Sequence, residues 1–90
     1  MLLHINLGFE FNLNNSSGNK TAYGLINSVI VDSTSGSEDG KMNLQVKENG
    51  SLTTKMTLKT NTVNIPNLPT SATGLVTGDL WNDGGTLKIA

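Results

Sequence analysis

Three strand-like segments follow one another through residues 21–58, and a turn-rich loop separates each from the next. The clearest two lie at residues 41–47 and 54–59, where apolar side chains alternate with lysine, threonine and amide residues. Such a two-residue period is typical of a strand with one apolar face. Asn49-Gly50 lies between them, and both residue types tolerate the positive φ angles of a type I′ turn. The pattern predicts a β-hairpin over residues 41–59 and an all-β fold.

The two faces of this hairpin follow from the same alternation. One strand carries Met42, Leu44 and Val46 on one side, with lysine and amide side chains on the other. On the return strand we expect the apolar residues to share a single inner face; these are Leu52, Met56 and Leu58. The hairpin therefore predicts a sheet with one apolar and one polar side.

Two other segments also have strand patterns. In residues 2–13 every odd position from residue 3 onwards is apolar, which indicates a strand with one buried face. A polar loop at residues 14–19 follows it. Residues 21–31 carry apolar side chains at both odd and even positions, which predicts a strand buried on both faces, or on one face plus a subunit interface. Gly24 within it indicates a bulge or a close approach of another backbone.

Proline interrupts the strand pattern in the last third of the chain. Val63 and Ile65 indicate a short strand that stops at Pro66, and residues 66–74 read as a loop or extended arm because proline disfavours strand pairing. A terminal β-hairpin is expected beyond this arm, with Trp81 as its anchor. No segment favours a helix.

These patterns predict two parts. Residues 1–65 are expected to form a β-strand domain that contains the hairpin at 41–59, and residues 66–90 a Pro-containing arm with the terminal hairpin. The terminal hairpin consists of segments 79–82 and 86–89 around an Asp-Gly-Gly turn.

The sequence contains few apolar and aromatic residues from which a single chain could build a core. Hydrophobic residues make up 36% of the 90 residues and aromatic residues only 4%, and a domain of this size buries a limited share of its surface. The chain has no cysteine, so neither disulfides nor thiolate metal ligands supply stability. We therefore expect a small antiparallel β domain that is completed by oligomerisation.

Charge argues against two classes of partner. The net charge is −1, the six lysines are spread along the chain and there is no arginine. Nucleic-acid binding is not expected, because it requires concentrated positive charge. The first seven residues have no basic region and no long apolar run, so neither a signal peptide nor a membrane span is expected.

Two places in the sequence are candidate ion sites. Asp32, Glu38 and Asp39 surround a Gly/Ser-rich loop, which suggests a hard cation such as calcium, but Thr34 and Gly36 stand where ligands of the known calcium loop belong. A solvated turn is the favoured interpretation. His4 is either a metal ligand on a trimer axis or an exposed or interfacial histidine, and we favour the second.

The terminal hairpin holds the other candidate site. Trp81, with Asn82 and Asp83 beside it, either contacts a sugar of a host glycan or packs in a small core or subunit interface, and packing is favoured. No constellation of residues resembles an active site, because there is one histidine and no carboxylate pair that indicates a cleft. We predict a non-enzymatic protein without catalytic, cofactor-binding or metal-binding residues.

Two stretches resemble parts of virion proteins of tailed bacteriophages, particularly tail fibres. The first runs from Phe11 to Leu58 and includes Asn-Asn-Ser-Ser-Gly-Asn-Lys-Thr, Tyr23-Gly24 and Gly-Ser-Glu-Asp-Gly at 36–40. The second, Leu68 to Ile89, is similar to the terminal segment of many such proteins, with its Leu-Pro-Thr-Ser start and Leu-Trp-Asn centre. The resemblance implies a β-rich homotrimer threaded along a fibre axis.

The function expected from this resemblance is structural. A trimeric tail-fibre domain that serves particle assembly or host attachment is the main hypothesis; it would reside in the virion after assembly in the host cytoplasm. Its partners would be other virion proteins of the tail or capsid, and a host surface glycan is a further candidate. Because tail fibres usually have a long anchoring region and a stalk, which these 90 residues do not contain, a capsid-decoration or head-fibre protein and a glycan-binding adhesin tip remain alternatives.

Overall fold

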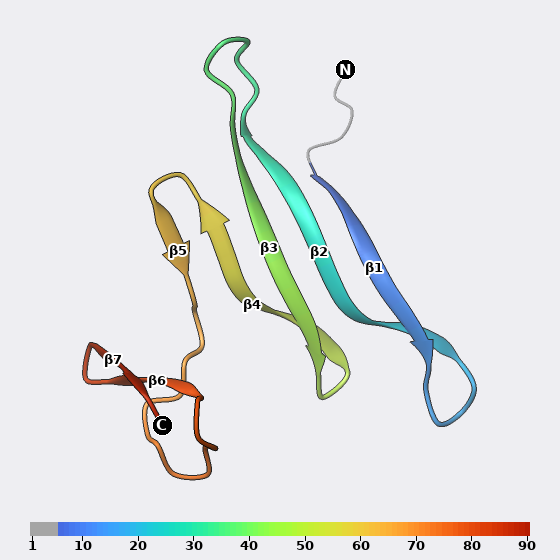
Figure 1. Ribbon diagram of the computed structural model, residues 1–90. Helices are drawn as coiled ribbons and strands as arrows, with labels where there is room; N and C mark the ends of the chain where they lie inside the picture. The colour runs from blue at the N-terminus through green and yellow to red at the C-terminus, as the bar shows by residue number, and fades with distance from the viewer. Residues whose placement is uncertain (1–5) are drawn as a thin grey trace.

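The computed structural model describes residues 6–90 (Figure 1). Within this range the chain consists of β-strands, turns and loops without a helix, which confirms the predicted all-β class. It follows that residues 6–90 include no helix that could span a membrane. The strands are β1 (Asn6–Asn14), β2 (Lys20–Asp32), β3 (Asp39–Glu48), β4 (Ser51–Lys59), β5 (Thr62–Asn64), β6 (Leu80–Asp83) and β7 (Thr86–Ile89).

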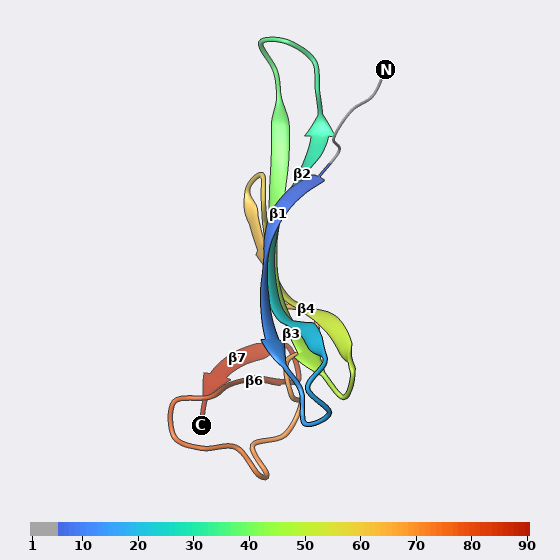
Figure 2. The ribbon, with the colours of Figure 1, turned by 90° about the vertical axis from the view of Figure 1, so that its right-hand side faces the viewer.

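The strands form two separate antiparallel sheets. The first has five strands in the order β1-β2-β3-β4-β5, and the second is the hairpin of β6 and β7. Each strand pairs with its neighbour in the sequence, so short turns suffice for every connection within a sheet. Figure 2 shows the larger sheet edge-on as one twisted layer, in agreement with overall dimensions of 49 × 41 × 15 Å.

The predicted hairpin over residues 41–59 is confirmed. β3 and β4 pair through Glu48 and Ser51, which leaves Asn49-Gly50 as a two-residue turn. The φ angles are 47° at Asn49 and 88° at Gly50, as a type I′ turn requires. Because the turn sets the register, it also decides which side chains of the two strands share a face.

Bulges change the alternation in β2 and β4. Phe11 pairs with Gly24 and Asn12 with Ala22, so Tyr23 is an extra residue beside the predicted glycine. In β4 the extra residue is Lys55, because Leu44 pairs with Met56 and Gln45 with Thr54. A bulge reverses the side to which the following residues point.

The expectation that Leu52 shares a face with Met56 and Leu58 is therefore wrong. Beyond the Lys55 bulge Leu52 pairs with Lys47 and lies on the opposite side of the sheet. The sequence around Lys55 carries no glycine to signal the bulge, unlike Gly24 in β2.

β2 is not buried on both faces within one chain, which corrects the first of the two readings of residues 21–31. Ile30 is 48% and Val31 60% exposed, because the sheet is a single layer and no Cα atom in the strands of the second sheet lies within 8 Å of a Cα atom in its strands. Among the described residues none is buried, whether apolar or polar. The other reading, one face plus a subunit interface, stays a prediction.

One glycine is required by the close approach of two strands. Gly8 of β1 pairs with Asn27 of β2, and a Cβ atom at Gly8 would lie 2.5 Å from the backbone oxygen of Ile26. A larger residue would push β1 away from the sheet. The odd-position alternation of residues 2–13 continues through β1 from residue 7 onwards, whereas residues 2–5 lie outside the described range.

The predicted terminal hairpin is confirmed as β6 and β7, but Asp83 pairs with Thr86, so the turn is Gly84-Gly85 alone and the first strand ends one residue later than expected. The segment before it is a folded loop rather than an extended arm. The Asn82 N–H donates to the Pro69 oxygen at 2.8 Å, and the N–H of Ala90 donates to the Asp79 oxygen at 2.7 Å. The first bond holds the loop against β6, and the second joins the residues that flank the open end of the hairpin.

Candidate interaction surface

One side of the five-stranded sheet is lined by apolar side chains contributed by every strand. Paired residues in an antiparallel sheet project to the same side, so the register of each strand pair identifies the set. We call it the apolar face. It consists of Leu7, Phe9, Phe11, Leu13, Ile26, Ile30, Met42, Leu44, Val46, Met56, Leu58 and Val63.

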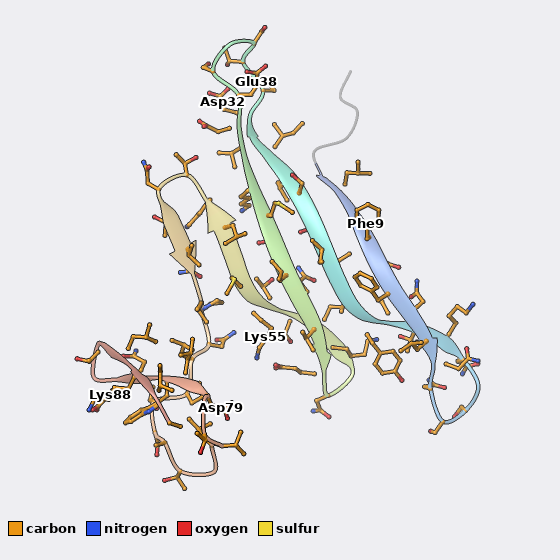
Figure 3. The ribbon with its side chains drawn as sticks, viewed as in Figure 1. Phe9, Asp32, Glu38, Lys55, Asp79 and Lys88 are labelled. Carbon is orange, nitrogen blue, oxygen red and sulfur yellow. The ribbon has the colours of Figure 1, made fainter. Side chains whose placement is uncertain are left out.

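The apolar face is open, and its exposure is greatest at β1. Leu7 is 73% and Phe9 74% exposed, whereas Leu44 in the middle of the sheet is half-buried. Figure 3 shows Phe9 on the outer strand of the sheet. Soluble monomers rarely leave a contiguous apolar patch of this kind open, and large patches mark interaction sites.

The other side of the sheet, the polar face, carries mostly polar and charged side chains together with Leu25, Val29 and Leu52. Asn27, Asn43, Thr57 and Asn64 pair successively across four strands and form a polar row. The Thr57 hydroxyl donates to Asn43 Oδ1 at 2.8 Å, and in the next row Gln45 Nε2 donates to the Thr54 hydroxyl at 3.2 Å. The two faces therefore have different chemistry.

Charged side chains also avoid the centre of the apolar face. By register, Glu10, Lys41 and Lys47 project from the polar face. At the end of the sheet near the β3–β4 turn, Glu48 and Lys55 form an ion pair with each other. These two charges compensate one another at this end of the sheet.

The terminal hairpin brings Trp81 and Asp83 together but not Asn82. Trp81 pairs with Lys88 across the hairpin, and Lys88 Nζ lies 5.7 Å from the centre of the indole ring and 2.5 Å from Asp83 Oδ2. The ammonium group thus combines a cation–π contact with an ion pair. Lys88, labelled in Figure 3, was not found from the sequence, because its place opposite Trp81 depends on the two-residue turn that the structure shows.

Asn82 points to the other side of the hairpin and has a structural role. Neighbouring residues of a strand project to opposite faces, and Asn82 pairs with Leu87. Its side-chain oxygen Oδ1 accepts a hydrogen bond from the Gly85 N–H at 2.7 Å, which holds the turn. Trp81 and Asp83 therefore share one side of the hairpin with Lys88 and Asn82 lies on the other side, and a glycan contact at these residues stays a prediction.

The acidic loop uses its carboxylates for local hydrogen bonds. Asp32 Oδ1 accepts from the Thr34 N–H at 2.9 Å, and Glu38 Oε1 accepts from the Gly36 N–H at 3.1 Å. Hydrogen bonds from the side chain and then the backbone of Thr34 lower the pKa of the exposed Asp32 carboxyl below its ordinary value of 3.8.

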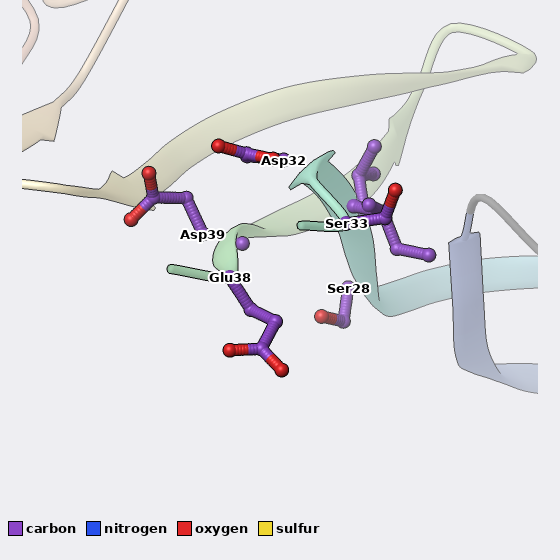
Figure 4. A pocket seen from close by; sticks show the side chains of 8 residues that line it. Ser28, Asp32, Ser33, Glu38 and Asp39 are labelled. Atoms are coloured by element: carbon purple, nitrogen blue, oxygen red, sulfur yellow. The ribbon is translucent and has the colours of Figure 1, made fainter. Parts of the chain in front are cut away.

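An open depression lies beside this loop, and Figure 4 shows Glu38 pointing away from Asp32 and Asp39. In residues 6–90 there is no group of three histidine or acidic side chains that could hold a metal ion. His4, the other residue weighed as a ligand, lies outside the described residues.

Comparison with known proteins does not assign the chain to a family. No protein-family model matches it, and no curated protein or solved structure is significantly similar to it. The apolar face is therefore the feature of the described structure from which a function can be argued.

Proposed function

We propose that the chain is a non-enzymatic structural module of a tailed-bacteriophage virion, which works as a homotrimeric tail-fibre domain in particle assembly or host attachment. The observation that supports this most directly is the open apolar face on a sheet in which none of the described residues is buried. A chain of this kind gains its stability from association with other chains. The resemblance of residues 11–58 and 68–89 to phage virion proteins supplies the biological setting.

Energetics favour association over a solitary sheet. Burial of apolar surface stabilises by roughly 25 cal/mol per Å², so covering the apolar face contributes several kcal/mol per chain by this coefficient. This is comparable to the whole stability of a small domain. The two edge strands add a second reason, because β1 has unpaired backbone groups along one side that another chain can cover.

The described residues also favour a structural over a catalytic role. The carboxylates of the acidic loop are engaged in hydrogen bonds that shape the loop. Asp83 is paired with Lys88, and Glu48 with Lys55. These contacts use the ionisable side chains as structural elements, as expected of a protein whose work is assembly.

Light scattering coupled to size exclusion tests the proposal. We expect the purified chain to elute with three times the mass of one chain at micromolar concentration. A folded monomer at all concentrations contradicts the proposal. Near-stoichiometric binding to empty capsids would instead assign the chain to capsid decoration.

Host-cell binding tests the adhesin alternative. The informative outcome would be binding that is lost in Trp81→Ala while the chain stays folded and assembled, because it would assign Trp81 to a host-glycan contact. If Trp81→Ala unfolds the terminal hairpin, the indole ring serves packing.

A further inference from the structure

We propose that the apolar face is covered by the apolar face of another copy of this chain, so that copies assemble sheet against sheet with their polar faces outward. This inference adds to the proposed function the surface through which copies associate. It rests on that function only because copies must associate at all. It leaves the number of copies to the light-scattering experiment.

The charge distribution favours a second copy as the occupant. The strand residues with ionic side chains at register positions project from the polar face, apart from the mutually paired Glu48 and Lys55. Two apolar faces can therefore meet without burying an unpaired charge, which would cost several kcal/mol. A partner with a charged surface would find no complementary group over most of this face.

The size of the face matches what a stable interface needs. The four long strands have 9 to 13 residues each. With strands about 4.8 Å apart and a rise of about 3.3 Å per residue, they present roughly 600 Å² per copy. Two such faces give roughly 1,200 Å², which is at the lower end of specific protein–protein interfaces. Sheets that pack face to face in this way interdigitate their side chains about 10 Å apart.

The described part of the chain does not cover this face itself. No Cα atom in the strands of the terminal hairpin lies within 8 Å of a Cα atom in the strands of the larger sheet. Only at the β5 margin does the terminal segment come near, where Val63, Leu68 and Leu87 border one depression. The side chains of β1 gain most from a second copy, because they lie at the edge and are covered by one neighbouring strand alone.

Thiol reactivity tests the inference directly, because the chain has no cysteine. We would compare Phe9→Cys, on the apolar face, with Glu10→Cys, the next residue of β1 on the polar face. Both positions are exposed in one chain. In the assembled protein we expect the thiol at residue 9 to react with a thiol reagent at least about tenfold more slowly than the thiol at residue 10, since access controls the rate.

The difference is expected to vanish when dilution or urea dissociates the assembly. Met42→Cys repeats the test on β3, in case Phe9→Cys weakens the association, and light scattering of each variant shows its state. Equal rates at residues 9 and 10 in an assembled protein overturn the inference.

The outcomes separate this inference from the proposed function. A trimer with equal thiol rates keeps the trimeric function and overturns the apolar face as its interface. A dimer with a protected thiol supports the interface and overturns the trimer. A monomer overturns both. A mass that is not a multiple of one chain shows that a different protein occupies the face, which also overturns the inference.

Discussion

The five-stranded sheet and the terminal segment of residues 66–90 are stabilised in different ways. The terminal segment closes on itself over a short stretch: backbone bonds join Pro69 to Asn82 and Asp79 to Ala90. Lys88 also links Trp81 to Asp83. The sheet has far more strand pairing, yet one of its sides stays open.

This difference shows that satisfied backbone groups do not amount to a core. Strand pairing satisfies the backbone donors and acceptors of the sheet, but each such bond contributes only about 0.5–1.5 kcal/mol net because water competes for the same groups. The larger favourable term is apolar burial, and the sheet leaves it unrealised within one chain. The sheet, with its continuous apolar face, is thus the region that would gain most from the proposed association with other copies.

The most severe test of this contrast is a charge on the apolar face. We expect Phe9→Lys to abolish assembly, because a lysine between two apolar faces costs several kcal/mol. The measurement is mass by light scattering. The matched control is Asn12→Lys, which adds the same charge on the polar side of β1 and is expected to leave assembly intact. An assembled Phe9→Lys protein would contradict the self-packing proposal.

Truncation of apolar side chains compares the two regions directly. Leu44→Ala lies in the centre of the apolar face and is expected to destabilise the assembled protein by about 2–4 kcal/mol, because it leaves a cavity between sheets. Leu80→Ala in the terminal hairpin, where Leu80 is 38% exposed, is expected to cost about 1 kcal/mol. Urea denaturation measures both. Similar losses for the two variants would remove the distinction between the regions.

The β3–β4 turn tests how far the sheet depends on its local geometry. Asn49→Pro is expected to destabilise by about 1–3 kcal/mol, because proline fixes φ near −65° whereas φ is 47° here. Asn49→Gly is the control, since glycine adopts positive φ without strain. Thermal unfolding of the two variants gives the comparison, and unchanged stability in Asn49→Pro would show that the turn lies elsewhere.

A smaller and local effect is expected in the terminal segment. Asn82→Ala removes the hydrogen bond to the Gly85 N–H and is expected to cost about 1 kcal/mol. Amide hydrogen exchange should speed up at Gly85 and stay unchanged at Leu44. Faster exchange across the large sheet would show that the two regions unfold together.

The smallest effect concerns pH in the acidic loop. Because the pKa of Asp32 is lowered from 3.8 by hydrogen bonds from Thr34, its contribution to stability is fully present above pH 3.8. It is lost as the pH falls through the lowered pKa of the folded state. The amide resonance of Thr34, followed by NMR during acid titration, reports this loss, and Asp32→Asn should show no such transition. A midpoint at or above 3.8 would contradict the hydrogen-bond effect.

Elements with local signals can be predicted from the order of the residues alone. The two-residue alternation identifies strands because backbone pleating sends neighbouring side chains to opposite sides. Asn49-Gly50 identifies the turn because few other residues adopt its φ angles. Gly24 marked the bulge of β2. That Trp81 and Asn82 face opposite ways also follows from strand geometry, once 80–83 is known to be a strand.

How these elements combine depends on pairing between strands and is visible in the folded chain alone. The bulge at Lys55, which moves Leu52 to the polar face, depends on register across two strands and has no local marker in the sequence. The position of Lys88 over Trp81 depends on cross-strand pairing. Apolar residues from five strands gather on one open face only when the register of every strand pair is correct. The pattern of a single strand shows that it has two sides, but not which side of the neighbouring strand lies next to each.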